Sequence, residues 1–146
     1  MTSRRGGRDA GSVLPLVIGV VVILTALVTV VTDVSVLWLQ RRSLQATVDG
    51  AALAGAQAVD LRVVYAGGAR GDLPLDPRAV RVAVRTYTRA VPSARELDAF
   101  RVVSVTVIGP TVTVRAQATA RPPFLVFLTG RGVAVVAEAS ARTSAG

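Results

Sequence analysis

The sequence predicts an α+β protein in which a long N-terminal transmembrane helix continues into a small domain with a three-stranded antiparallel sheet. Two patterns lead to this prediction. Residues 10–32 carry no charged side chain, and a helical periodicity continues beyond them to about Val59. The C-terminal third of the chain instead alternates apolar and polar residues, which is typical of strands with one buried face.

The uncharged run is long enough to cross a membrane. A hydrocarbon core about 30 Å thick requires roughly 20 apolar residues of helix. A cleaved secretory signal would have an apolar region of about 7–15 residues followed by a small-x-small site. The run here is longer and lacks a clear Ala-x-Ala. We therefore expect residues 12–32 to form an uncleaved transmembrane helix.

Basic residues near the span predict its orientation. Three arginines precede the span, and the next basic pair, Arg41 and Arg42, lies further out beyond its other end. Positive charges close to a span favour the cytoplasmic side. We therefore expect residues 1–11 to form the cytoplasmic basic tail of an inner-membrane protein, and residues 33–146 to form an extracytoplasmic domain. The arginines of the tail are Arg4, Arg5 and Arg8.

The composition argues against an enzyme. The chain has no His and no Cys, which removes the usual ligands of zinc and haem and the usual partners of Ser/His or Cys/His catalysis. Its 9 acidic residues follow no motif. We therefore expect no catalytic residue, no cofactor and no metal site. Nucleic acid is not expected as a partner, because the basic residues do not cluster and no aromatic series accompanies them.

The helical pattern beyond the span is amphipathic and rich in small residues. No proline occurs between Pro15 and Pro74, so we expect one helix from about Ser12 to about Val59. Small side chains allow another backbone to approach closely. Either a sheet of the same chain or other subunits pack against this face, or each takes a different side. The apolar and small positions are Leu37, Leu44, Val48, Ala51, Ala52 and Gly55.

A shorter helix is expected after a connecting loop at residues 60–76. Asp76 and Pro77 form an N-cap followed by a first-turn proline, and Pro92 ends the helix. One face of this helix is apolar and the other carries four arginines. These arginines form either an anion-binding stripe or an ordinary solvated face. They are Arg78, Arg81, Arg85 and Arg89.

The strands are expected on either side of Gly109-Pro110, as a hairpin, and at residues 133–142. Three strands with one apolar face need a cover, and the Ala-rich half of the long helix is the expected one. Residues 124–128 are consecutive apolar residues that either plug the end of the core or touch the outer leaflet or a partner. The strand residues expected on the covered face are Val103, Val105, Val107, Val112, Val114, Ala116, Ala118, Val133, Val135, Ala137, Ala139 and Ala141.

A series of features along the first helix carries a family resemblance. Gly11 precedes the apolar run, Asp33 closes it, residues 41–45 read RRSLQ, and Asp49 is followed by the small-residue segment 51–56. In this order and spacing, the features resemble the N-terminal region of TadE/TadG-like proteins of the tight-adherence, or Flp, pilus system. The tail of the chain, a hairpin followed by PPFLVFLTG and an Ala-rich strand, is also similar to short members of this group.

The resemblance implies a structural envelope protein of pilus biogenesis with a pilin-like helix-on-sheet form. Its implied partners are the membrane and other pilus-assembly or pilin-like membrane proteins. Pseudopilins of this system are cut after a glycine and carry Glu five residues on, whereas Leu16 stands there in this chain and Pro15 precedes it. A retained anchor is therefore expected. The helix positions implied in packing or assembly are Asp33, Asp49, Ala51, Ala52 and Gly55.

A different class of function follows from the arginines alone. A membrane-tethered binding module for an anionic wall polymer or another polyanion would use the stripe from Arg78 to Arg89. Such a module would bind in a salt-sensitive manner, whereas a structural protein would fail in assembly when altered.

Overall fold

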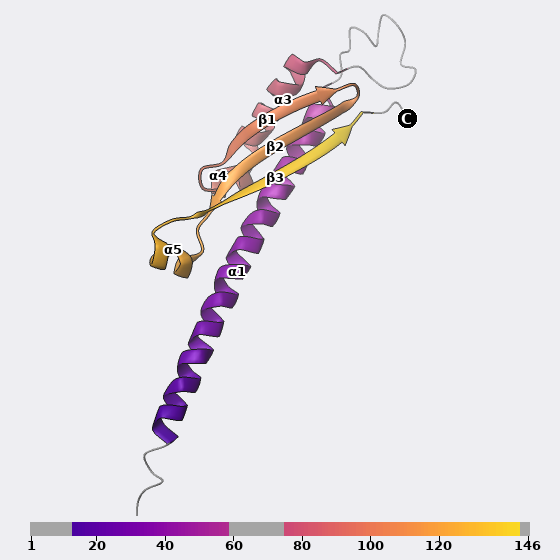
Figure 1. The fold of residues 1–146 in the computed structure, drawn as a ribbon. Coiled ribbons are helices and arrows are strands. Elements are labelled where there is room, and N and C mark those ends of the chain that lie inside the picture. Colours follow the sequence, from indigo (N-terminus) through magenta and orange to yellow (C-terminus); the bar gives the residue numbers. More distant parts are fainter. Residues whose placement is uncertain (1–12, 59–74, 144–146) are drawn as a thin grey trace, which may run out of the picture.

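A computed structural model of the chain describes residues 13–58 and 75–143 and shows the expected α+β arrangement (Figure 1). The tail at residues 1–11 and all but the end of the expected loop at residues 60–76 lie outside the described residues. The elements are α1 (Val13–Ala56), α3 (Pro77–Ala90), α4 (Pro92–Glu96), β1 (Arg101–Ile108), β2 (Thr111–Ala120), α5 (Pro123–Thr129) and β3 (Val133–Arg142).

Helix α1 serves two environments along its length. It has 44 residues, which at 1.5 Å per residue makes it about 66 Å long. Its first part projects alone from the domain, and its last part lies under the sheet (Figure 1). The first part is long and apolar enough to cross a membrane, and none of its most apolar stretch is buried within the chain. The predicted uninterrupted helix is confirmed.

The sheet is antiparallel with the strand order β1-β2-β3. The β1–β2 hairpin turns at Gly109, whose φ of 56° is a backbone conformation that glycine adopts without strain. β3 returns along β2, so that Val112 lies opposite Ala141 and Ala120 lies opposite Val133. The predicted hairpin and third strand are therefore confirmed. The central strand has the most regular burial, with Val112, Val114, Ala116 and Ala118 all buried.

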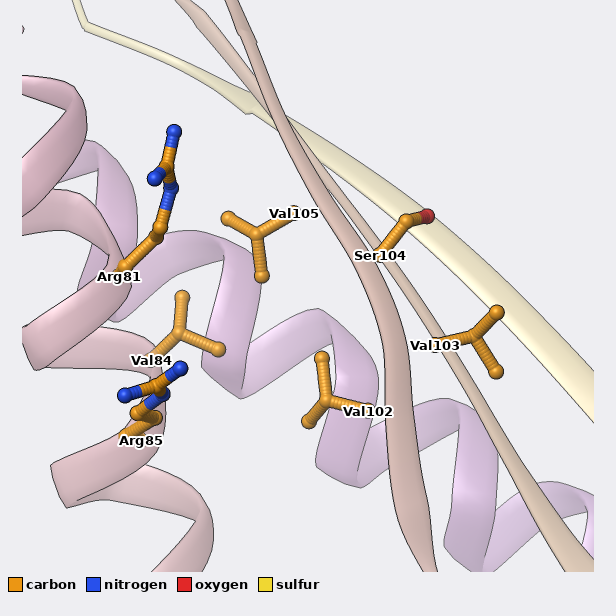
Figure 2. A pocket seen from close by; sticks show the side chains of 7 residues that line it. All are labelled: Arg81, Val84, Arg85, Val102, Val103, Ser104 and Val105. Carbon is orange, nitrogen blue, oxygen red and sulfur yellow. The ribbon is translucent and has the colours of Figure 1, made fainter.

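A position of β1 lies on the opposite face from the predicted one because this strand contains an irregularity. The pairing of β1 with β2 shifts between Val102 and Ser104, which lets one strand accommodate an extra residue and reverses the alternation locally. Val102 is consequently half-buried and Val103 is 52% exposed. Figure 2 shows Val102 and Val105 pointing toward the helices and Val103 pointing away. The placement of Val103 on the covered face was wrong.

The core forms where α1 and α3 meet the sheet. A Cβ atom added at Gly55 would lie 3.1 Å from a Val112 methyl and 3.2 Å from methyls of Val80 and Val84. The small residues of α1 thus bring the helix backbone close to both α3 and β2. The close packing on the sheet was predicted from the Ala-rich composition, and the packing on α3 was not. Nearby, a Cβ atom at Gly50 would overlap the ring of Tyr87 on α3.

Proline positions explain the segment after α3. Helix α3 begins after Asp76, whose Oδ1 accepts a hydrogen bond of 2.8 Å from the Arg78 N–H, and it ends at Ala90 before Pro92, as predicted. Pro92 also starts the short helix α4, which the sequence did not indicate. This helix contacts α1 through Ser93, whose Oγ lies 2.8 Å from Oγ1 of the buried Thr47.

The apolar segment at residues 124–128 does not plug the core. It forms α5, none of whose residues is buried, and Phe127 and Leu128 are 86% and 78% exposed. The residues just before α5, Ala120 and Pro122, are by contrast both buried. Helix α5 lies beside α1 below the sheet, next to the part of α1 that projects from the domain (Figure 1). The plug interpretation was therefore wrong.

Candidate functional site

Asp33 joins the end of the apolar run to α5. Its Oδ1 accepts a hydrogen bond of 3.1 Å from the N–H of Phe124, and its Oδ2 accepts one of 2.7 Å from the N–H of Leu125. The first N–H groups of a helix have no partner within the helix, so the carboxylate supplies acceptors that α5 lacks. A residue of the first helix thereby positions a segment 92 residues away in sequence.

Asp49 contacts the side chain of Gln45, which lies one turn earlier on α1. Nε2 of Gln45 donates to Asp49 Oδ1 at 2.9 Å and to the backbone oxygen of Glu138 at 3.1 Å. Glu138 belongs to β3, an edge strand of the sheet. Asp49 thus holds the Gln45 amide in the orientation that ties α1 to this edge.

The remaining three helix positions lie inside the domain. Ala51 and Ala52 are 0% and 1% exposed, and Gly55 is buried between α3 and β2. Their neighbours are therefore residues of the same chain. A contact between α1 and another subunit requires a different face of the helix.

The four arginines of α3 are all exposed. Arg81 and Arg85 line a hollow of about 250 Å³ between α3 and β1, together with Val84, Val102 and Val105 among others. Figure 2 shows both side chains rising from α3 on the side that faces β1. Arg78 and Arg89 do not line this hollow, so the structure does not bring the four side chains together into one site.

Two features of α1 beyond the span were not identified from the sequence. The Arg42 guanidinium lies 5.4 Å from the ring centroid of Trp38, a cation–π distance. Leu39 and Leu53 are 58% and 56% exposed, and the exposed Ala46 lies between them at a spacing of seven residues. This exposed stripe of Leu39, Ala46 and Leu53 runs along the face of α1 that the domain leaves uncovered. The recurrence of these residues at every seventh position is the pattern in the sequence that could have indicated this stripe.

No gathering of acidic side chains suited to a metal ion occurs within residues 13–58 and 75–143. The expectation of a non-enzymatic protein without metal or cofactor stays a prediction.

Within residues 13–58 and 75–143, one helix is long and apolar enough to cross a membrane, and the same helix supplies part of the core of a helix-on-sheet domain, as in a membrane protein anchored by one span. Residues 11–58 match the family model Tad, described as "Putative Flp pilus-assembly TadE/G-like". This matched segment, which covers about a third of the chain, is similar to the TadE/TadG-like family. No curated protein and no solved structure matches the chain.

The contact between Asp33 and α5 leads to a local prediction. Asp33→Ala removes both acceptors, so the amide hydrogens of Phe124 and Leu125 are expected to exchange at least about tenfold faster, since hydrogen bonds to charged groups contribute about 1.5–3 kcal/mol. Hydrogen exchange measured on the detergent-solubilised protein tests this. Asp49→Ala is the control, because the hydrogen bond assigned to its side chain comes from Gln45 and not from α5. Unchanged exchange in Asp33→Ala would contradict the assigned contact.

Proposed function

We propose that this protein is an inner-membrane-anchored structural or accessory component of Tad/Flp-type pilus assembly or a related secretion machine. Its N-terminus lies in the cytoplasm and residues 33–146 lie on the extracytoplasmic side. The observation that carries the proposal is the coincidence of the family match at residues 11–58 with a helix that is both span and domain core. Neither the match nor the scattered arginines favour the alternative of an anion-binding module.

The orientation rests on the charges that flank the span. The chain contains no Cys, so single cysteines placed at Ser3 and at the exposed Thr106 report each side of the membrane without background. An impermeant maleimide is expected to label Thr106→Cys in intact spheroplasts, and Ser3→Cys only after permeabilisation. Replacing Arg4, Arg5 and Arg8 by Gln is expected to reduce the correctly oriented fraction. Labelling of Ser3→Cys in intact spheroplasts would refute the orientation.

The exposed stripe of α1 is the surface that we assign to assembly. The buried small residues are occupied by the chain itself, whereas Leu39, Ala46 and Leu53 remain open along the extracytoplasmic part of the helix. An apolar stripe at heptad spacing suits packing against a second helix. Asp49, which is also exposed, contributes a carboxylate near this surface.

Leu53→Glu tests this assignment. The charge is expected to remove recovery of pilin-like membrane proteins in a pull-down after detergent extraction, and to reduce the number of pili, because a carboxylate would be desolvated in a helix–helix contact. The domain should stay folded, since Leu53 is 56% exposed. Ile108→Glu is the matched control, at a residue that is 73% exposed on the far hairpin. Recovery and piliation that equal those of the control would contradict the proposal.

A further inference from the structure

Helix α5 exposes more apolar surface than a short helix in water would be expected to keep. Phe127 and Leu128 are 86% and 78% exposed, and Phe124 is 41% exposed. The helix contributes nothing to the core, since none of its residues is buried. Exposed apolar clusters of this kind mark contact sites, so we expect a membrane or another protein to cover this one.

Helix α5 lies next to the residue of α1 at which the apolar run ends. The carboxylate of Asp33 holds the backbone of Phe124 and Leu125, and Asp33 is the first charged residue after the apolar run that begins at Ala10. The two hydrogen bonds therefore place α5 at the depth where the span leaves the hydrocarbon core. Figure 1 shows α5 beside α1, below the sheet, on the loops that join β2 to β3. Its exposed apolar residues therefore follow closely on the end of the apolar run of α1.

The residues around α5 have the character of a membrane interface. Trp38 is 59% exposed about one and a half turns beyond Asp33, and Trp is the residue most typical of the headgroup level. Arg41, Arg42 and Arg131 are exposed at the same end of the domain, and among the described residues no carboxylate pairs with them. Arg41 lies beside the first residues of β3, which follow α5 directly. Positive charge beside an apolar helix complements anionic headgroups.

We propose that α5 is a second membrane contact, which inserts Phe127 and Leu128 into the leaflet on the domain's side, with Asp33 as the residue that positions it. A lipid surface fits better than a second protein, because a stable protein interface buries about 1,200–2,000 Å² in total and α5 has only 7 residues. The contact limits tilting of the domain on its span. The proposed contact does not depend on which side of the membrane the domain occupies, nor on a role of the protein in pilus assembly.

Tryptophan quenching in vesicles tests the proposal with the full-length chain. The single Trp of the protein is removed by Trp38→Phe, and Phe127→Trp is introduced as the reporter. The protein is reconstituted in phosphatidylcholine–phosphatidylglycerol vesicles with or without phosphatidylcholine brominated at acyl carbons 6 and 7. The matched control carries Ile108→Trp, because Ile108 is 73% exposed at the opposite end of the sheet. Circular dichroism confirms that both variants are folded.

Brominated lipid is expected to reduce the emission of the Phe127→Trp reporter at least twofold, at every protein-to-lipid ratio, and to leave the Ile108→Trp control unchanged. Acrylamide is expected to quench only the control strongly. Equal acrylamide quenching of both reporters would overturn the proposal. A reporter shielded from acrylamide but not quenched by brominated lipid, or quenched only at low protein density, would show that protein covers α5 and would also overturn it.

The positioning role of Asp33 has its own readout. Adding Asp33→Ala to the Phe127→Trp reporter is expected to reduce the quenching by brominated lipid by about half, because α5 is no longer held at one depth. Asp49→Ala in the same background should leave the quenching unchanged, since Asp49 bonds only to Gln45 among the contacts assigned to it. Equal quenching with and without Asp33→Ala would refute the assignment of Asp33 as the positioning residue.

Discussion

Leu44→Ala is expected to lower the free energy of unfolding by about 2–5 kcal/mol, the range for leucine truncation in a packed core. Leu44 is 0% exposed and belongs to the core between α1 and the sheet. Its removal leaves a cavity that the flanking residues of a continuous helix and a central strand are poorly placed to fill. Because small domains have total stabilities of about 5–15 kcal/mol, this change should be among the most damaging single substitutions in the chain.

Denaturant unfolding of the detergent-solubilised protein, followed by the circular dichroism of the sheet, measures the effect. Leu53→Ala is the matched control, with the same side chain on the same helix but 56% exposed. Its expected effect is within about 0.5 kcal/mol, as for other surface positions. If both substitutions destabilised the protein equally, the assignment of the buried face of α1 would be wrong.

Gly55→Leu is expected to destabilise the domain by about 1–3 kcal/mol or more. The cause is overpacking of the core, whereas Leu44→Ala leaves a cavity. A Cβ atom at this position would already lie 3.1–3.2 Å from three valine methyls on two different elements. The larger branched side chain of leucine requires α1 to move away from α3 and β2 together. The expected result is a lower unfolding midpoint and greater sensitivity of the α3 region to limited proteolysis.

Gly19→Leu provides the comparison for Gly55→Leu. A Cβ atom at Gly19 would meet nothing within 4 Å, because this part of α1 projects from the domain. The substitution should therefore leave the unfolding of the domain unchanged. Equal unfolding midpoints for Gly55→Leu and the unsubstituted protein would show that α3 does not pack on α1 as described.

The sequence specified the long helix and most of the strand faces because these depend on local periodicity. The small residues at Ala51, Ala52 and Gly55 and the alternation of β2 recur at the spacing of their own element, so burial followed from the pattern. The irregularity at Val102 and Ser104 has no such pattern. A strand with three consecutive apolar or small residues reads equally well in either register, and pairing with β2 decides which side chain is covered.

The candidate site was predictable only in part. The resemblance singled out Asp33 and Asp49, but not the groups that they contact. Asp33 meets α5 from the far end of the sequence, and the apolar residues of α5 have no periodicity that indicates which of them remain exposed. Gln45, which connects Asp49 to β3, belongs to the RRSLQ segment of the resemblance, but nothing in the sequence indicates that it contacts β3. These pairings depend on tertiary structure, because the sheet brings α5 back beside α1.

The uninterrupted course of α1 couples the membrane to the sheet. No proline follows Pro15 within this helix. Each residue inserted between the span and the domain would therefore rotate the domain about the helix axis by about 100° relative to the span. The lipid-facing side of the span and the open side of the domain therefore have a fixed angular phase. A neighbouring helix that packs along both must have the same phase, which makes rotation about the membrane normal a determinant of how copies or partners arrange themselves around this protein.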